Sequence, residues 1–301
     1  MLFGIAAYGL WGVFPLYLHL LDDIRPMEVV ANRIAWSLIV VAAILFVTRR
    51  LGRIGAIMRD RRLLRLLAPA AVLIAVNWAV YIYAISVDRV IEGALGYFIT
   101  PLVSVAFGMA VFGERLRRAQ AVALVLGTLA VVVLTVYYGG FPWISVTLGL
   151  SFGTYGLLKK LADVPTAEAL AVETLLLFLP AVALMAGLAW TGEGALFSDG
   201  AGTTLLLVGA GPVTAVPLLL FGASVTRVPL TTIGLMQYLT PVLQFLIGWL
   251  VLGEAMPATR WIGFALVWSA LAVLTWDALR AVRREGAAGE RVLAEEIVEP
   301  A

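Results

Sequence analysis

The amino-acid sequence predicts an all-α membrane protein with ten transmembrane helices, arranged as two inverted five-helix repeats with both termini in the cytoplasm. Three observations support this fold class. The composition is too apolar for a soluble domain, a pattern of residues recurs after 140 positions, and basic residues gather in alternate loops. The composition predicts a location in a membrane, the repeat predicts internal symmetry, and the basic loops predict the orientation in the membrane.

The composition and the length of the apolar runs indicate a membrane protein. Apolar residues make up 62% of the chain and charged residues 13%, against about 45–50% and about 25% in soluble domains. A bilayer core requires about 20 mostly apolar residues per helix, and the first such run, Met1–Leu21, lacks the basic region and cleavage site of a signal peptide. Turn residues and charges divide the chain into ten expected helices: 1–20, 28–47, 65–86, 91–113, 119–138, 142–160, 169–190, 203–226, 229–252 and 258–278.

The distribution of basic residues predicts the orientation. With the N-terminus in the cytoplasm, the cytoplasmic loops and the tail hold seventeen lysines and arginines, whereas the opposite side holds only Arg25, Arg89 and Arg260. This bias follows the positive-inside rule. The arginines therefore mark a membrane face and give no indication of nucleic-acid binding.

Two segments outside the expected spans have their own predictions. Segment 49–65 carries seven arginines and is either an interfacial helix, with Leu51, Ile54 and Met58 on one side, or a solvated linker. Segment 285–301 is acidic and short, and we expect a disordered cytoplasmic tail.

One long phrase occurs twice in the chain. Residues Tyr97–Glu114 read YFITPLVSVAFGMAVFGE, and residues Gln237–Glu254 read QYLTPVLQFLIGWLVLGE. The repeat divides the chain into two domains, 1–138 and 142–279, with five expected helices each. Because five is odd, the second domain enters the membrane upside down relative to the first, which is typical of secondary transporters.

Each copy of the phrase contains a threonine followed by a proline near the middle of an expected helix, at Thr100-Pro101 and Thr240-Pro241. Proline removes a backbone hydrogen bond and kinks a helix. In lipid the freed carbonyl is tolerated only where it packs on protein or lines a cavity. Two related kinks at mid-depth favour a central site, although a packing kink without a ligand is the alternative.

Several short stretches resemble the EamA type of the drug/metabolite transporter superfamily: Asn77-Trp78, Glu92–Ile99, Gly113–Arg118 and Gln237–Pro241. The likeness covers about residues 1–284. It implies a ten-helix bundle in the bacterial inner membrane, with a central cavity lined mainly by the first, third, fourth, sixth, eighth and ninth helices. The resemblance implies the class of protein and leaves the transported solute open.

Polar and aromatic residues on the expected cavity helices are the candidates for binding a small organic solute, because an aromatic body with a polar tip suits such ligands. Asn77 lies near mid-depth, where an amide needs a partner. It is expected either to join helices by a hydrogen bond or to line the cavity. The complete set of candidate binding residues is Trp11, Asn77, Trp78, Tyr97, Thr100, Tyr155, Gln237, Tyr238 and Thr240.

Charged residues inside expected spans are candidates for gating or ionic roles, together with Pro101 and Pro241. Arg33 and Glu173 are 140 positions apart, so inverted symmetry separates them by about 15 Å of depth and argues against a direct pair. Snorkelling to the interface is the alternative for both. Expected partners are Asp22, Asp88 or Glu92 for Arg33, and Lys159, Lys160 or Arg227 for Glu173.

Glu92 is also a candidate for a gate or a proton acceptor on the non-cytoplasmic side.

No residue pattern favours an enzyme, a metal site or a cofactor. The chain has no cysteine and one histidine, His19, which excludes thiolate sites and argues against histidine clusters. The match to G-x-S-x-G at 149–153 lies in an expected membrane helix and is interpreted as a contact between helices. We therefore expect an inner-membrane carrier that exports or exchanges small organic metabolites or drugs. A membrane-embedded enzyme or a channel is the alternative, and the oligomeric state stays open.

Overall fold

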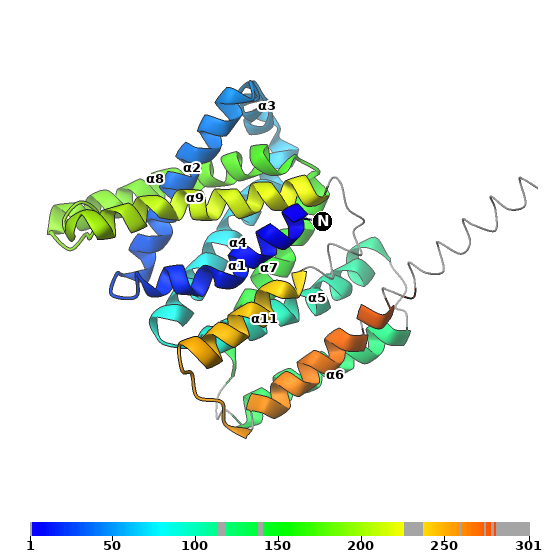
Figure 1. Cartoon of the computed structure of the whole chain (residues 1–301). Coiled ribbons are helices and arrows are strands. Elements are labelled where there is room, and N and C mark those ends of the chain that lie inside the picture. Colours follow the sequence, from blue (N-terminus) through cyan, green and yellow to red (C-terminus); the bar gives the residue numbers. More distant parts are fainter. Residues whose placement is uncertain are drawn as a thin grey trace, which may run out of the picture.

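The computed structural model describes residues 2–113, 118–137, 141–225, 237–258, 260–273, 275–277 and 280. The regular secondary structure within these ranges is helical throughout (Figure 1). Six helices of this part are long and apolar enough to cross a membrane, and two shorter apolar helices cover Ala121–Val133 and Leu239–Val251. The all-α prediction is thus confirmed for the described residues.

The helices follow the expected runs closely, because each begins and ends where turn residues or charges interrupt the apolar sequence. Helical backbone also covers 260–273, within the last expected helix, while residues 229–236 of the expected ninth helix lie outside the described part. The helices are α1 (Leu2–His19), α2 (Pro26–Val47), α3 (Gly52–Arg59), α4 (Arg61–Ser86), α5 (Val90–Phe112), α6 (Arg118–Tyr137), α7 (Trp143–Ala162), α8 (Thr166–Thr191), α9 (Gly200–Val225), α11 (Leu239–Leu246) and the π-helix η1 (Ile247–Val251).

Helix α3 answers the open question about segment 49–65. Asp60 separates α3 from α4, and its carboxylate accepts hydrogen bonds from the N–H groups of Arg62 and Leu63. Ile57 is buried in a cluster with Leu67 of α4 and with residues of α7 and α8. The segment therefore forms a short helix that packs on the protein rather than a solvated linker.

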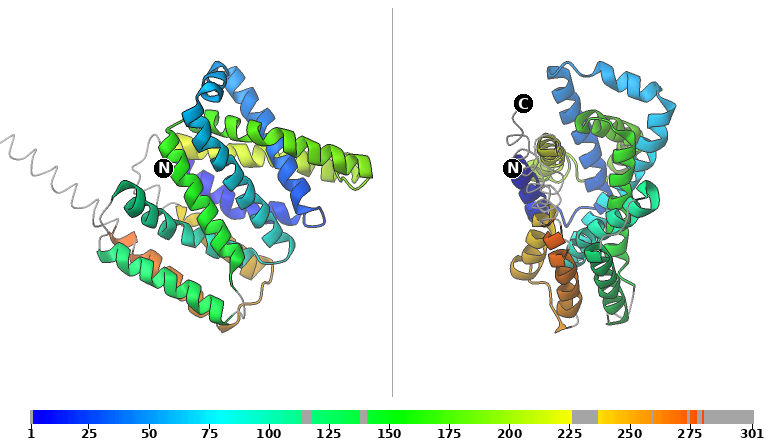
Figure 2. Two further views of the ribbon diagram at one scale, coloured as in Figure 1. Left: turned by 180° about the vertical axis from the view of Figure 1, so that it is seen from behind. Right: turned by 90° about the vertical axis from the view of Figure 1, so that its right-hand side faces the viewer.

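The described helices form a bundle in which neighbours in space are often far apart in sequence. Helix α2 packs against α8 and α9, α1 against α9 and α11, and α7 against α4 and α5. Helix α6 and the helical segment 260–273 lie side by side at one edge, where Ala123 and Ala270 share a buried cluster (Figure 2). Elements of the two sequence halves thus pack against each other across the molecule.

Glycines allow the closest helix contacts. A Cβ atom at Gly96 of α5 would lie 2.9 Å from the carbonyl oxygen of Ser145 in α7, so only glycine fits without a shift of the backbone. On the facing helix, a Cβ at Gly149 would lie 2.8 Å from Ile99, and one at Gly153 would lie 2.5 Å from Val103. The G-x-S-x-G match therefore belongs to a contact between helices.

Pro101 lies near the middle of α5, as predicted, and Pro241 lies in the first turn of α11. Pro241 is the third residue of α11, in its first turn, because the helical pattern is interrupted at Tyr238. The beginning of the expected ninth helix, residues 229–236, lies outside the described part, so the mid-helix position of Pro241 stays a prediction. Pro101 lies on the helical backbone of α5, and its side chain lies outside the described part.

Candidate functional site

A buried arginine lies where α1, α2, α4 and α9 meet. Arg33 of α2 is only 5% exposed, and its Nε donates a hydrogen bond of 2.7 Å to the hydroxyl oxygen of Thr214 in α9. Its guanidinium carbon lies 4.2 Å from the centre of the Trp78 ring and 4.7 Å from that of Phe14. The faces of these rings carry partial negative charge and stabilise the cation.

The carboxylate partners expected for Arg33 are wrong. Among the residues that the structure describes, no carboxylate forms an ion pair with Arg33: Asp22 pairs with His19 at 3.1 Å, and Glu92 pairs with Arg89. Each acid contacts a basic side chain three residues before it in the chain, rather than Arg33 of α2. Arg33 is also buried by protein and does not snorkel to an open surface.

Asn77 connects three helices next to this arginine. Its amide nitrogen donates to the carbonyl oxygen of Leu148 at 3.1 Å and to the hydroxyl of Ser151 at 3.0 Å, both on α7. Its amide oxygen accepts from the hydroxyl of Tyr97 on α5, also at 3.0 Å. Asn77 was expected either to join helices or to line a cavity, and the structure shows the hydrogen bonds between helices. Tyr97 and Trp78 are thereby brought to the same region.

Glu173 of α8 lies in a second polar cluster. Its carboxylate is 1% exposed, contacts the Lys159 amine at 2.8 Å and accepts a hydrogen bond from the Tyr155 hydroxyl at 3.1 Å. Lys159 was one of three expected partners. Tyr155, a candidate binding residue, is therefore engaged by Glu173 through its hydroxyl.

The remaining candidate binding residues lie in three places. Thr240 donates to the carbonyl oxygen of Tyr8 at 2.8 Å, and Gln244 donates to that of Trp11 at 3.0 Å, so these contacts join α11 to α1. The Trp11 ring packs on Tyr8 and Phe221. Thr100 is buried and bonds within its own helix to Gly96 at 3.4 Å.

The last two candidates, Gln237 and Tyr238, are half-buried at the start of the segment 237–258. Tyr238 lines an open pocket of about 440 Å³, together with Trp268, Trp276 and small apolar side chains. Its lining is almost wholly apolar. This pocket lies beside α11, away from Arg33 and Asn77, so the structure does not gather all nine candidates in one place.

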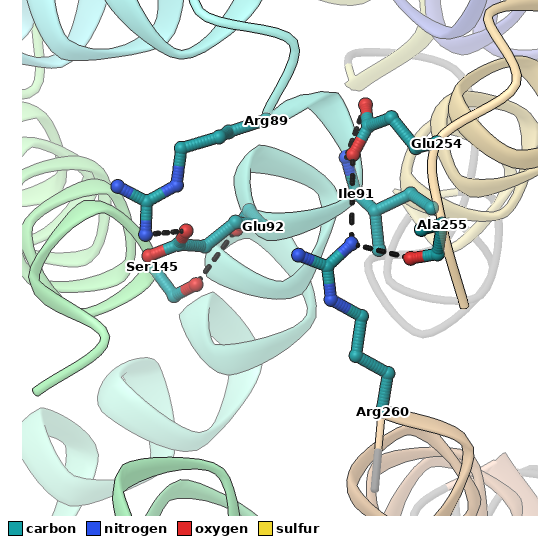
Figure 3. A network of polar contacts seen from close by, with 7 residues as sticks. All are labelled: Arg89, Ile91, Glu92, Ser145, Glu254, Ala255 and Arg260. Atoms are coloured by element: carbon teal, nitrogen blue, oxygen red, sulfur yellow. Dashed lines mark hydrogen bonds and ion pairs between the residues drawn. The ribbon is translucent and has the colours of Figure 1, made fainter. Parts of the chain in front are cut away.

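A polar network at the first turn of α5 was not predicted as a whole (Figure 3). Both carboxylate oxygens of Glu254 lie 3.2 Å from the backbone N–H of Ile91, which has no intrahelical acceptor. Arg260 lies 4.0 Å from the same carboxylate and donates to the carbonyl oxygen of Ala255 at 2.7 Å. A carboxylate from one sequence half thus caps a helix of the other half.

The same turn of α5 is held from its other side. Glu92 forms an ion pair with Arg89, and its backbone carbonyl accepts a hydrogen bond of 2.7 Å from the Ser145 hydroxyl of α7 (Figure 3). Local backbone geometry positions Glu254: η1 precedes it, and Gly253 adopts a φ of +69°. A Cβ at Gly248 would lie 3.1 Å from the carboxylate, so this glycine leaves room for it.

Burial sets the electrostatics of this network. The Glu254 carboxyl lies in the loop after η1 and is 7% exposed. Burial raises its pKa from the ordinary 4.5 to about 7, against the opposing effect of the backbone N–H groups that it accepts. The nearby acids Asp88 and Glu92 add to the rise. The signal for Glu254 was present in the sequence, because it ends the repeated phrase.

Two glutamates that are 140 positions apart make equivalent contacts. Glu28, in the first turn of α2, accepts from the N–H groups of Ala195 and Leu196 at 2.8 and 3.1 Å, in the loop after α8. Glu168, in the first turn of α8, pairs with Arg53 at 3.2 Å and Arg50 at 4.0 Å, after α2. Each first-turn carboxylate therefore holds the segment that follows the other helix.

No group of three or more histidine, aspartate or glutamate side chains converges as a metal site within the described ranges. The polar groups found there donate and accept hydrogen bonds between helices. Arg33 combines a permanent charge with aromatic surroundings and is the strongest candidate for contact with a ligand.

The chain is similar to other proteins over nearly its whole length. It is 50% identical over 305 residues to Protein RarD of Streptomyces exfoliatus, covering 100% of this chain and 97% of that protein. It is 39% identical to an uncharacterized transporter of Pseudomonas aeruginosa, covering 93% and 94% of the two chains. A crystal structure that is 22% identical shares the fold with a TM-score of 0.58 and covers 93% of this chain and 97% of that one.

The sequence pattern of the EamA-like transporter family matches the chain twice, at residues 1–136 and at residues 141–276. Together these ranges include the arginine site, the Asn77 contacts and the network at the first turn of α5. The chain is therefore a membrane transporter of the drug/metabolite type and belongs to the EamA-like transporter family.

Proposed function

We propose that the protein is a secondary transporter of the bacterial inner membrane that exports or exchanges small organic solutes by alternating access. One observation carries this proposal: Glu28 and Glu168, which are 140 positions apart, make equivalent contacts after each other's helices. Two equivalent halves are the architecture that rocks around a midplane site in many carriers. The double family match supports the same division of the chain.

In this proposal the two halves are residues 1–138 and 142–279, inverted relative to each other, and both termini are cytoplasmic. The first turn of α5 then lies on the extracytoplasmic side, together with Arg89, Arg260 and the loop that carries Glu254. The arginine-rich contacts of Glu168 lie on the cytoplasmic side. Segment 285–301 is a cytoplasmic tail in this scheme.

The network in Figure 3 acts as the extracytoplasmic gate. Ile91 and Glu92 belong to the first half, whereas Ser145, Glu254 and Arg260 belong to the second. Outward opening separates the halves and requires these contacts to break together. Closure restores these contacts. The gate therefore has a closed state with the contacts made and an open state with the contacts broken, as alternating access requires.

The candidate binding residues surround the path of the solute on helices from both halves. The first half contributes mainly Asn77, Trp78 and Tyr97, which lie beside Arg33. Helix α1 contributes Trp11 to the site, and segment 237–258 contributes Gln237, Tyr238 and Thr240. Thr100 and Tyr155 complete the set on α5 and α7.

The test is counterflow in proteoliposomes that contain the purified chain. Vesicles are loaded with unlabelled amino acids, nucleosides or amphenicols, and the labelled solute is added outside. We expect saturable, transient accumulation of the label for at least one solute, and none in protein-free vesicles. Linear, non-saturable flux would indicate a channel, and conversion of the solute would indicate an enzyme. Either result, or no counterflow with any solute, would contradict the proposal.

A further inference from the structure

Two side chains in the arginine site, those of Arg33 and Tyr81, have hydrogen-bond donors without an acceptor among the described residues. The guanidinium of Arg33 uses only Nε, toward Thr214, and within the described ranges no carboxylate pairs with it. The hydroxyl of Tyr81 on α4 is buried, with the residue 2% exposed, and has no hydrogen-bond partner there. The Phe14 ring stacks on the Tyr81 ring, with 6.5 Å between their centres, and its centre lies 4.7 Å from the guanidinium carbon of Arg33, so both side chains pack on the same ring.

The other tyrosines around Arg33 are satisfied. Tyr97 donates to Asn77 at 3.0 Å, and Tyr17 donates to the carbonyl oxygen of Leu206. Burying an unpartnered polar group or an unpaired charge is unfavourable. Within the described residues, Arg33 and Tyr81 therefore keep open donor capacity in this aromatic cluster.

We propose that Arg33 and Tyr81 form a subsite for the carboxylate of an organic acid. This inference rests on the proposed transport function and names the substrate class. A guanidinium offers paired N–H groups that match the two oxygens of a carboxylate, and the tyrosine hydroxyl adds a third donor. The Trp78 and Phe14 rings hold the guanidinium in place and provide apolar walls for the carbon skeleton.

A cationic or a neutral solute fits the same groups less well. A cation is repelled by Arg33. A neutral amide offers one oxygen to the donors of Arg33 and Tyr81, and its own N–H groups then face donors rather than acceptors. A purely structural role, in which Arg33 only anchors α2 to α9 through Thr214, uses Nε alone and leaves the rest of the guanidinium and Tyr81 unexplained.

The experiment compares acids with their own amides. Thermal unfolding of the purified full-length chain in detergent is measured with phenylacetate or phenylacetamide, indole-3-acetate or its amide, and hexanoate or hexanamide. Sodium chloride at equal ionic strength tests whether any small anion suffices. A ligand that binds the folded state raises the unfolding temperature. We expect at least one acid to stabilise the wild type, and its amide and chloride to have no such effect.

Variants assign the effect to the two side chains. Arg33→Gln should abolish the acid-over-amide preference, and Arg33→Lys should weaken acid binding because the amine lacks the paired N–H groups. Tyr81→Phe removes one hydrogen bond to the carboxylate and should weaken acid binding about tenfold while the preference persists. Thr174→Val is the matched control, since this buried threonine of α8 bonds to the carbonyl oxygens of Leu170 and Ala171 in its own helix, and the variant should keep the preference.

Three results would overturn the proposal: equal stabilisation by acids and amides, an acid preference that survives in Arg33→Gln, or no stabilisation of the wild type by any acid. If Arg33→Gln does not fold, Arg33→Lys and Tyr81→Phe still decide the question. Binding is measured without transport, so acid-selective binding with no counterflow would contradict the transport function alone. Counterflow without acid selectivity would contradict only this inference.

Discussion

At the scale of single residues, the polar side chains of this protein act mainly between helices that are distant in sequence. Asn77 joins α4 to α5 and α7, whereas Asn32, also buried, bonds only within α2, to Glu28 and Trp36. In a membrane, helices persist when the bundle comes apart, so a bond within one helix contributes less to the bundle than a bond between helices.

We therefore expect Asn77→Ala to lower the free energy of unfolding by about 0.6–1.7 kcal/mol. The substitution removes three hydrogen bonds and leaves the Tyr97 hydroxyl without its acceptor. Asn32→Ala is the matched control and should have a smaller effect. Denaturant unfolding in detergent, followed by circular dichroism, measures both variants. Equal losses would contradict the assignment of Asn77 as an interhelical contact.

The raised pKa of Glu254 predicts a pH dependence of stability. Its pKa of about 7 in the folded protein exceeds its ordinary value of 4.5, so the folded state holds the proton more tightly. The stabilisation from this group is present at low pH and is lost as the pH rises through about 7. Asp88, Glu92, Arg89 and Arg260 are the charged groups around it.

The unfolding temperature of the wild type should accordingly fall between pH of about 5 and about 8. Glu254→Gln should remove part of this decrease, because the amide oxygen still accepts from Ile91 and does not ionise. Glu193→Gln is the control: Glu193 is exposed, and the Arg25 guanidinium beside it lowers the pKa of its carboxyl. A pH profile of Glu254→Gln identical to that of the wild type would contradict this prediction.

At the scale of elements, the helices could be predicted from the sequence and their contacts could not. Apolar runs and interrupting charges fix where α2, α4 or α8 begins and ends, because that information is local. The partner of Arg33 could not be found in this way, since Phe14, Trp78 and Thr214 lie on three other helices. Lys159 could be named for Glu173 because both lie next to the short turn that joins α7 to α8.

The contact between α1 and α11 gives a prediction at this scale. A Cβ at Gly12 would lie 2.5 Å from Cδ1 of Leu243, whereas a Cβ at Gly9 on the same helix meets nothing within 4 Å. Gly12→Ala should therefore destabilise the protein by about 1–3 kcal/mol through overpacking. Gly9→Ala is the matched control and should be neutral or stabilising, since alanine favours helix.

Adding Leu243→Ala to Gly12→Ala should restore part of the loss, because the smaller side chain makes room for the new methyl group. Thermal unfolding of the single and double variants measures this coupling. Additive losses would show that the two helices do not meet at these residues.

Replacing either repeated proline by alanine should affect transport rather than folding. Pro241 stands in the first turn of α11, just after the interruption at Tyr238. Pro241→Ala restores an N–H and favours helix across this interruption, which alters the balance between inward-open and outward-open states. A bias of about 1.4 kcal/mol changes the ratio of the two states tenfold, so counterflow per folded molecule should fall sharply.

Pro101→Ala should act in the same direction, and Pro180→Ala, inside α8 and outside the proposed cavity helices, is the control. Labelling of single introduced cysteines from each side reports the bias directly. Unchanged turnover and unchanged accessibility in both Pro101→Ala and Pro241→Ala would contradict a role for these prolines in switching.

At the scale of the whole molecule, the proposed inverted arrangement predicts that opposite ends of the bundle are equivalent. Glu28 holds the loop after α8 with its carboxylate, and Glu168 holds the arginines after α2. If the halves are inverted, these two contacts lie on opposite sides of the membrane. The Glu168 contacts then lie with the arginine-rich segment 49–65 in the cytoplasm, and the Glu28 contacts lie outside.

Fusion of alkaline phosphatase tests this orientation, because the enzyme is active only outside the cytoplasm. A fusion after Gly194, in the loop bound by Glu28, should be active, and a fusion after Arg62, close to the arginines bound by Glu168, should be inactive. Green fluorescent protein at the same two positions is the complementary control and should fluoresce only after Arg62. Activity on the same side for both fusions would exclude the inverted repeat. A reversed pattern would keep the symmetry but place Arg89, Glu254 and Arg260 in the cytoplasm, and the network at the first turn of α5 would then be a cytoplasmic gate.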